Sequence, residues 1–433
     1  MTGSDAQLDP SQLRAVDLAR RCGVSLISGA AGSGKTFVGA ALAREAEDRG
    51  LSVALCAPTG KAAKRIEDSV ARVAGFRVEA KTIHRLLGAK HDGTWEYGPG
   101  NKLDVDLVIV DEMSMVDVPL AWRLLAALDL DRTRLVLVGD HHQLPPVGPG
   151  NVLRDLIARR LVPTTILAYC HRQAGILKHN CTAILTGHVE STALPAMRLP
   201  NGASPWMRIA RKGMTAETAA DTIVSIYAAI LAHGPYAVPA DVQVLVAMHK
   251  GACGTIELNR RLQAVVQERV YGRTPEPLEG PQRHARPMVG DRVIQMVNDY
   301  ELGSCGIFNG TTGIVTEAAD GLLVVRFEGE NTETVLAEKK QIRNVELAYC
   351  LTVHKSQGSE YPCCLIAAHK SASFMTHRSW LYTACTRAQQ SAIVIGDSWG
   401  INACAQKVET SRRRTILSLA EAREAGGKGD SGC

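Results

Sequence analysis

A glycine-rich loop between an apolar run and an alanine-rich segment places the strongest constraint on how this chain folds. The stretch reads LISGAAGSGKTFVGAALA and spans residues 26–43. It matches the pattern G-x-x-x-x-G-K-[ST], with Gly29 and Gly34 in the loop and Lys35 and Thr36 at its end. Glycines permit the tight turn, and the backbone N–H groups gather where the next helix begins. The pattern therefore predicts a strand, a loop and a helix of an α/β fold.

Further apolar runs of strand length extend this unit. They are nearly continuous rather than alternating, as buried parallel strands are. The first series consists of residues 24–28, 52–57, 106–110 and 134–139, with helical patterns at 36–49, 61–73 and 116–128. A second series consists of residues 241–248, 363–368 and 391–396. We therefore expect two tandem α/β units, each a parallel sheet flanked by helices, in residues 1–167 and in residues 168–280 with 346–410.

Two segments interrupt these units. Residues 281–345 carry short β-like runs separated by glycines at intervals of roughly ten residues, which predicts a small inserted barrel. Residues 88–104 contain Trp95 and Tyr97 among glycines, a pattern that fits a hairpin. Residues 411–433 look like a short helix followed by a flexible tail.

Composition excludes several classes of protein. The sequence contains no run of about 18 uncharged apolar residues, which a membrane span would need. The first residues lack the basic and apolar parts of a secretory signal. Twelve cysteines contain no C-x-x-C pair, so neither a zinc site nor a disulfide framework is indicated. The net charge of +5 permits a polyanionic partner without requiring one. We expect a cytoplasmic protein with no membrane partner.

The glycine loop predicts a site for a nucleotide with Mg²⁺. Lys35 would neutralise the β- and γ-phosphate oxygens and Thr36 would ligate the metal. An apolar strand ends in Asp111 and Glu112, suited to hold Mg²⁺ and to polarise the attacking water. Gln143 follows the next strand and could sense the γ-phosphate. The neighbouring His141–His142 pair lacks a third metal ligand, so a structural role is favoured over metal binding. The predicted phosphate-binding residues are Gly29, Ala30, Ala31, Gly32, Ser33, Gly34, Lys35, Thr36 and Phe37.

Further motifs follow one another along the chain. They are APTGKAAKR at 57–65, KTIHRLL at 81–87, VIVDEMSMVD at 108–117, VGDHHQLPPVGPG at 138–150, TVHKSQGSEYP at 352–362 and LYTACTRAQQ at 381–390. Their order resembles that of superfamily 1 helicases, and most closely the RecD-like branch that moves 5′ to 3′ on DNA. The resemblance runs from about residue 8 to 400 and implies two RecA-like domains. It implies a minimal helicase core without the long N-terminal region of the longer RecD-like proteins.

The resemblance also implies roles for single residues. Gln12 matches the family's adenine contact, and Glu360 matches a contact to the ribose. Arg172 and Arg387 match two arginines that reach the γ-phosphate from the second domain. A guanidinium supplied from a second domain stabilises charge on the transferred phosphoryl group and couples hydrolysis to closure. ATP and Mg²⁺ are the implied nucleotide and metal.

Contacts to single-stranded DNA are implied in both domains. Hydroxyl, amide and lysine side chains suit sequence-independent binding of phosphates. Taken singly, each would more often be a helix cap or a solvated side chain. The matching residues are Pro58, Thr59, Gly60, Lys61, Thr82 and His84 in the first domain, and Thr352, His354, Lys355, Ser356 and Gln357 in the second.

The two insertions match further family features. Residues 88–104 stand where a strand-separating pin is found, and residues 281–345 where an SH3-like barrel encloses DNA. Tyr300 and Phe308 lie within the second insertion and fit the barrel core better than a DNA contact. These matches lead us to expect a small β-hairpin and an SH3-like β-barrel.

The sequence therefore predicts an ATP-dependent DNA helicase that acts on single strands and at junctions of single- and double-stranded DNA. A DNA-stimulated translocase or an RNA helicase stays open as an alternative. So does an ATPase subunit of a recombination nuclease complex, although the intact set of hydrolysis residues argues against a vestigial site. We expect a monomer with partners among DNA repair or replication proteins.

Overall fold

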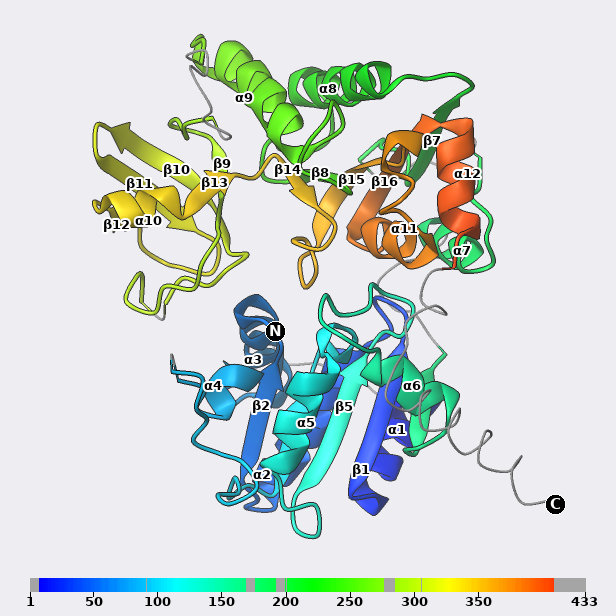
Figure 1. Ribbon diagram of the computed structural model, residues 1–433, viewed down its shortest axis with the longest axis vertical. Coiled ribbons are helices and arrows are strands. Elements are labelled where there is room, and N and C mark those ends of the chain that lie inside the picture. Colours follow the sequence, from blue (N-terminus) through cyan, green and yellow to red (C-terminus); the bar gives the residue numbers. More distant parts are fainter. Residues whose placement is uncertain are drawn as a thin grey trace, which may run out of the picture. The chain divides into compact units, whose positions relative to one another are not determined.

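The computed structural model describes residues 8–90, 92–168, 176–191, 199, 201–275, 285–304 and 306–408 (Figure 1). These residues form two compact units, one from residues 8–168 and one from residues 176–408. Each unit has its own hydrophobic core. Within the described ranges, no helix has the length and apolar character needed to cross a membrane.

The first unit is built on a parallel sheet of six strands within residues 8–168, in the order β3-β2-β4-β5-β1-β6. The order brings β1 and β4 to either side of β5, so the chain segments that follow these strands leave the same edge. The strands are β1 Val24–Gly29, β2 Val53–Ala57, β3 Ala80–Thr82, β4 Leu107–Val110, β5 Arg134–Gly139 and β6 Thr164–Leu167.

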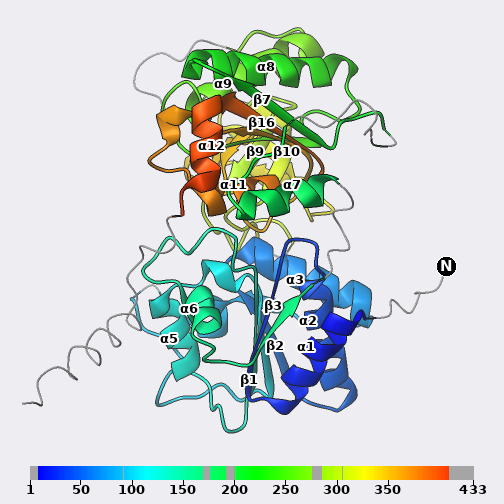
Figure 2. The same cartoon turned by 90° about the vertical axis from the view of Figure 1, so that its right-hand side faces the viewer.

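Helices cover both faces of this sheet, with α1, α2 and α3 on one face and α5 and α6 on the other (Figure 2). Side chains alternate between the faces, since Ile27 packs with the first helix group and Leu26 with the second. The helices are α1 Pro10–Arg21, α2 Lys35–Asp48, α3 Gly60–Ala74, α4 Ile83–Leu86, η1 Met113–Met115, α5 Val118–Ala126 and α6 Val152–Ala158. All six strands are paired in parallel, so buried apolar runs are required in the middle of the sheet.

Residues 88–104 lie outside the regular strands of this unit. Isolated antiparallel bridges join Ala89 to Trp95 and Gly98 to Asn101. Trp95 and Tyr97 are partly buried against the core that α5 and α6 share with the sheet. The Trp95 ring also lies 5.4 Å from the ring of His84. This segment is therefore packed onto the first unit through Trp95 and Tyr97.

The second unit contains a parallel sheet within residues 176–408, in the order β14-β8-β15-β16-β7. Its strands are β7 Trp206–Arg211, β8 Val242–Val246, β14 Cys350–Thr352, β15 Tyr361–Ala367 and β16 Ala388–Asp397. Its helices are α7 Ile176–Leu185, α8 Ala216–His233, α9 Thr255–Tyr271, η2 Lys370–Ala372, α11 Arg378–Cys385 and α12 Ser398–Gln406. Helices α8 and α9 lie over one face, while α7, α11 and α12 gather on the other (Figure 1).

An antiparallel sheet is inserted between α9 and β14, in the order β12-β11-β10-β9-β13. Its elements are β9 Arg292–Gln295, β10 Thr312–Ala319, β11 Leu322–Phe327, β12 Thr334–Leu336, α10 Lys339–Arg343 and β13 Val345–Leu347. Val293, Val325 and Phe327 of this sheet share one continuous core with Leu258 of α9 and Val244 of β8. The inserted sheet is therefore fused to the second unit through its hydrophobic interior.

The expected parallel α/β fold is confirmed in both units. Strand β5 has the predicted bounds, and β1, β2 and β4 differ from their apolar runs by one residue at an end. The prediction that Tyr300 lies in the barrel core is wrong, because 52% of this residue is exposed to solvent. It lies beyond β9, where a turn carries its ring out to pack edge-on at 5.7 Å from the ring of Phe308.

Candidate nucleotide and nucleic-acid site

The glycine loop of the first unit has the backbone geometry that its sequence requires. Gly32 and Gly34 adopt positive φ angles of 76° and 81°, a region that favours glycine. At Gly29 an added Cβ would lie 2.6 Å from the Ser33 hydroxyl oxygen and 3.1 Å from the Cβ of Leu167. The loop is therefore tightly turned, and it leads into the N-terminus of α2. Backbone N–H groups at a helix N-terminus attract anions.

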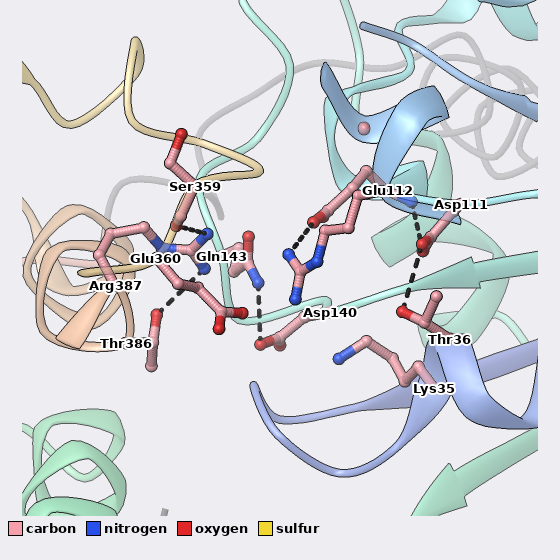
Figure 3. A network of polar contacts seen from close by, with 12 residues as sticks. Lys35, Thr36, Asp111, Glu112, Asp140, Gln143, Ser359, Glu360, Thr386 and Arg387 are labelled. Carbon is pink, nitrogen blue, oxygen red and sulfur yellow. Dashed lines mark hydrogen bonds and ion pairs between the residues drawn. The ribbon is translucent and has the colours of Figure 1, made fainter. Parts of the chain in front are cut away.

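Lys35 and Thr36 form the first turn of α2. The Nζ of Lys35 donates hydrogen bonds to the carbonyls of Gly29 at 2.7 Å and Ala30 at 3.0 Å. The Thr36 hydroxyl donates to Oδ2 of Asp111 at 3.4 Å. Figure 3 shows both side chains close to Asp111 and Glu112, which follow β4. The fold thus joins the glycine loop to the acidic pair, as expected for the carboxyl edge of a parallel sheet.

Burial dominates the electrostatics of the acidic pair. It raises the pKa of Asp111 to about 6, and the charge of Glu112 acts in the same direction. The backbone N–H of Glu112, 2.8 Å from Oδ1 of Asp111, and the cations of Arg65 and Lys35 oppose that rise. Glu112 itself has φ 52° and ψ 42°, a left-handed conformation that is rare outside glycine. A divalent cation at Asp111 would relieve the cost of burying this charge.

The segment after β5 brings an amide and two imidazoles to the same edge. Gln143 is buried and donates to Asp140 at 3.4 Å, while its Oε1 has no hydrogen-bond partner among the described residues. The Nδ1 of His141 lies 2.7 Å from the Ser28 hydroxyl at the end of β1. Burial lowers the pKa of His141 to about 4, so its ring is neutral at physiological pH. A buried acceptor without a donor in the described chain indicates a group that acts on a ligand or on water.

Gln12 links the N-terminal helix to the glycine loop. Its Nε2 donates to the carbonyl of Ser33 at 3.3 Å, and its Oε1 accepts from the N–H of Asp9 at 3.0 Å. Asp9 in turn caps α1, so the two side chains form a capping box. The residue predicted to contact adenine therefore lies against the phosphate loop and is buried there.

The candidate DNA contacts of the first unit lie at helix starts. The Thr59 hydroxyl caps α3 by accepting from the N–H of Ala62 at 3.2 Å, and Thr82 caps α4 in the same way. Gly60 and Lys61 form the first turn of α3, directly after Pro58. His84 is exposed on α4. Thr59 and Thr82 therefore act as helix caps, and each satisfies one N–H group of the first turn.

The candidate contacts of the second unit lie in the turn after β14. Lys355 donates to Oδ1 of Asn309 at 2.8 Å, and His354 is half-buried beside it. Thr352, Ser356 and Gln357 are buried. The Nε2 of Gln357 has no hydrogen-bond partner within the described chain. The turn therefore holds one half-buried lysine against Asn309 and keeps a buried amide unsatisfied.

Arg387 is held inside the second unit. It is 2% exposed and donates to the carbonyls of Ser359 at 3.1 Å and Thr383 at 3.2 Å. Glu360 accepts from the amide of Gln389 at 3.4 Å, and Figure 3 shows it on the segment that carries Ser359. Arg172 lies outside the described residues.

Sequence reasoning missed one charged side chain at this site. The Nη1 of Arg65 lies 3.9 Å from Oε1 of Glu112. Arg65 stands on α3, one helical turn beyond Lys61, so the two share a face of the helix. The i, i+4 spacing within APTGKAAKR was the available signal, but it does not reveal which carboxylate lies opposite.

Sequence comparison places known families on both units. The model of the AAA domain family matches residues 7–198, and that of the UvrD-like helicase C-terminal domain matches residues 347–395. The ATP-dependent RecD2 DNA helicase of Deinococcus radiodurans is 36% identical over 396 residues, covering 88% of this chain and 48% of that protein. The chain thus spans about half the length of this relative.

Two solved structures share the fold. The Bacteroides Pif1 bound to single-stranded DNA superposes with a TM-score of 0.50 at 19% sequence identity, covering 98% of this chain and 99% of that one. The Pif1 helicase of Candida albicans gives a TM-score of 0.50 at 16% identity, covering 97% and 99% of the two chains. These structures share the RecA-like fold of a parallel sheet flanked by helices that each unit of this chain shows.

A second curated relative decides the family. The RecD subunit of the RecBCD enzyme of Mycolicibacterium smegmatis is 31% identical over 423 residues, which cover 92% of this chain and 72% of that subunit. This chain therefore belongs to the RecD family.

Proposed function

We propose that this protein is an ATP-dependent DNA helicase that moves 5′ to 3′ along a single strand. The observation that carries the proposal is the meeting of Lys35, Thr36 and the Asp111–Glu112 pair at one sheet edge. This is the donor set needed to hydrolyse a nucleoside triphosphate. The helicase names of the RecD2 relative and of the Pif1 structures support the same activity.

The residues at this edge fit Mg²⁺. Thr36 and Asp111 supply a hydroxyl and a carboxylate, the oxygen donors that this cation prefers. Asp111 is 5% exposed, so a cation would offset the cost of its buried charge. When bound, Mg²⁺ would neutralise charge on the β- and γ-phosphate oxygens.

The chain's own groups would then carry the chemistry. Lys35 would leave the loop carbonyls that it now contacts and bind the β- and γ-phosphates. Glu112 would accept a proton from the attacking water, whose oxygen bonds to the γ-phosphorus as the bond to the β–γ bridging oxygen breaks. Gln143, with its unsatisfied Oε1, would orient that water. Gln12 and Glu360 would contact the adenine and the ribose.

Arg172 and Arg387 are proposed to stabilise charge on the transferred phosphoryl group. For Arg387 this requires exchange of the Ser359 and Thr383 carbonyls for phosphate oxygens. Such an exchange would make hydrolysis depend on a change of shape in the second unit, as a motor requires.

The proposed path of the DNA strand uses both units. In the first, Pro58, Thr59, Gly60, Lys61, Thr82 and His84 would contact its phosphates, and in the second, Thr352, His354, Lys355, Ser356 and Gln357. The helix start capped by Thr59 and the cation of Lys355 suit binding to a backbone rather than to bases. The segment 88–104 is proposed as the strand-separating pin and residues 281–345 as an SH3-like barrel that encloses the strand.

Two assays test this function. ATP hydrolysis is measured with and without single-stranded DNA, and unwinding is measured on duplexes with a 5′ or a 3′ single-stranded tail. We expect stimulation by the single strand and unwinding of the 5′-tailed duplex alone. Hydrolysis that is indifferent to DNA would count against the helicase, and unwinding of the 3′-tailed duplex alone would reverse the polarity.

The pin needs a gentler test than deletion, because Trp95 and Tyr97 contribute to the core. Shortening the exposed turn at 92–94 leaves those side chains in place. We expect lower unwinding with unchanged DNA-stimulated hydrolysis; unwinding at the full rate would remove the pin assignment. Protein partners from repair or replication and a monomeric, cytoplasmic state complete the proposal.

A further inference from the structure

An ion pair joins the candidate catalytic carboxylate to a helix that no hydrolysis role uses. The guanidinium of Arg65, on α3, lies 3.9 Å from the carboxylate of Glu112. The side chain of Glu112 is 13% exposed and that of Arg65 is 32% exposed, so the pair is only partly screened by water. Arg65 therefore acts on the orientation of Glu112 more strongly than an exposed surface cation would.

The backbone of Glu112 makes this contact decisive for where the carboxylate points. Its left-handed conformation and its N–H bond to Asp111 fix the Cα at the end of β4. The remaining freedom of Glu112 is the rotation of its side chain. A general base must lie within hydrogen-bond reach of the water that it deprotonates. While the carboxylate is turned to Arg65, that guanidinium competes with water for its oxygens.

Arg65 also faces the surface proposed to bind DNA. It follows Lys61 by four residues on α3, so both cations project from one face of the helix. The N-terminus of the same helix, capped by Thr59, attracts phosphate through its dipole. A phosphodiester that reaches this face meets Lys61 first and comes within one helical turn of Arg65.

We propose that Arg65 is a positioning residue that restrains Glu112 in the absence of DNA and releases it when a backbone phosphate of a single strand takes its guanidinium. The inference rests on the proposed function. It gives a physical path, within one unit, by which strand binding accelerates hydrolysis. A phosphate bound to the guanidinium would neutralise its charge and so weaken its attraction for the Glu112 carboxylate.

The test compares kcat for ATP hydrolysis, at saturating ATP and Mg²⁺, with and without saturating oligothymidylate. The variants are Arg65→Gln, Arg65→Lys and the control Arg72→Gln, which changes an exposed arginine near the end of the same helix. For Arg65→Gln we expect the DNA-free kcat to rise about threefold, as loss of a partly exposed ion pair allows. The stimulation ratio should fall by the same factor, with KM for ATP unchanged.

Arg65→Lys should retain most of the wild-type ratio, because an ammonium still pairs with Glu112, and Arg72→Gln should retain all of it. A second readout follows binding of the oligonucleotide against salt. If Arg65 takes a phosphate, the slope of log affinity against log salt should decrease in magnitude by about 0.7 in Arg65→Gln. A role in structure alone would leave that slope as it is in the wild type.

Failure of this inference is distinct from failure of the proposed function. If wild-type hydrolysis does not respond to DNA, the proposed function fails and the inference with it. If wild type responds and Arg65→Gln loses activity equally with and without DNA, the function stands and the restraint is overturned. Should Arg65→Gln not fold, raising salt on wild type from about 50 to 300 mM should increase the DNA-free kcat by weakening the ion pair; a constant or falling kcat contradicts the restraint.

Discussion

Two adjacent pairs of charged residues, one in each unit, show opposite ways of placing charge in a protein interior. Asp291 and Arg292, at the start of β9, are surrounded by fixed partners. Asp291 accepts from the amides of Gln263 and Gln267, from the Tyr349 hydroxyl and from the N–H of Met288. Arg292 donates to the carbonyls of Pro239 and Ala240, both at 2.8 Å, and pairs with Glu328 at 3.2 Å.

Asp111 and Glu112, which follow β4, have fewer and longer polar contacts by comparison. Asp111 receives one backbone N–H at 2.8 Å and a hydroxyl at 3.4 Å, and Glu112 receives an ion pair at 3.9 Å. A charge that serves structure is satisfied by donors that do not leave. A charge that serves a ligand is left with unused capacity, which the folded chain tolerates at a cost in stability. The predictions that follow break or sharpen this contrast.

The largest effect is expected for Glu112→Gln. Loss of the general base should lower kcat for ATP hydrolysis by about 10²- to 10⁴-fold, with little change in nucleotide affinity. The free energy of unfolding should change by less than about 1 kcal/mol, because loss of the long ion pair with Arg65 is offset by loss of the repulsion with Asp111. Kinetics and denaturant unfolding measure both, with Glu317→Gln, exposed on β10, as the control. A fall in stability with full activity would make Glu112 a structural residue.

Asp291→Ala should show the opposite profile. It removes one acceptor from the amides of Gln263 and Gln267, which keep the carbonyls of Arg286 and Val289, and it removes the acceptor of the buried Tyr349 hydroxyl. We expect a cost of about 3 kcal/mol of unfolding free energy. Denaturant unfolding of the whole chain measures the loss, and Asp320→Ala, at an exposed turn, controls for removal of a carboxylate. If the unfolding free energies of Asp291→Ala and Asp320→Ala lay within about 0.5 kcal/mol of each other, the buried network would be dispensable.

Asp111→Asn tests the cost of the unsatisfied charge through pH. The folded-state pKa of Asp111 is raised to about 6 from 3.8, so between these values the folded state binds more protons than the unfolded state. Wild-type stability should therefore fall as pH rises through this window, while Asn does not titrate. Without Mg²⁺ the variant should match wild type near pH 4 and exceed it by about 2 kcal/mol above pH 6.

Added Mg²⁺ should reduce that advantage, because the cation neutralises Asp111 in wild type only. Thermal or denaturant unfolding at several pH values, with and without the metal, gives both quantities. An advantage that is equal at pH 4 and pH 8 would mean that Asp111 carries no buried charge in the folded state.

The smallest effect is expected for Gln143→Leu. It removes one hydrogen bond at 3.4 Å together with an unpartnered buried oxygen, so unfolding free energy should shift by less than about 1 kcal/mol. Gln263→Leu, the matched change in the satisfied network, should cost about 2 kcal/mol. Equal losses at the two positions would erase the contrast between the networks. Slower hydrolysis in Gln143→Leu alone would support its place beside the attacking water.

The sequence predicted those parts of the fold that depend on local pattern. Strand β5 is a continuous apolar run and was predicted with its bounds, whereas β3 and β7 were missed because one is three residues long and the other mixes apolar with charged residues. The order of strands within each sheet was beyond prediction, since pairing joins segments far apart in the chain.

The candidate site divides in the same way. The meeting of Lys35, Thr36 and Asp111 followed from motif spacing and the rule of the carboxyl edge. The contact of Arg65 with Glu112 did not, because it depends on the left-handed backbone of Glu112 and on how α3 packs beside β2 and β3. Nor did the burial of Arg387 behind the Ser359 carbonyl, which depends on tertiary packing.

The continuous core between the inserted antiparallel sheet and α9 limits how this protein can be altered. Val293, Val325 and Phe327 fill space against Leu258 and Val244, so excising the sheet would uncover an apolar surface on the remaining unit. An exchange of this sheet with that of a relative would succeed only if the facing residues of α9 and β8 were transferred with it. The inserted sheet and the second unit therefore share one core, and a change of core residues in either must be matched in the other.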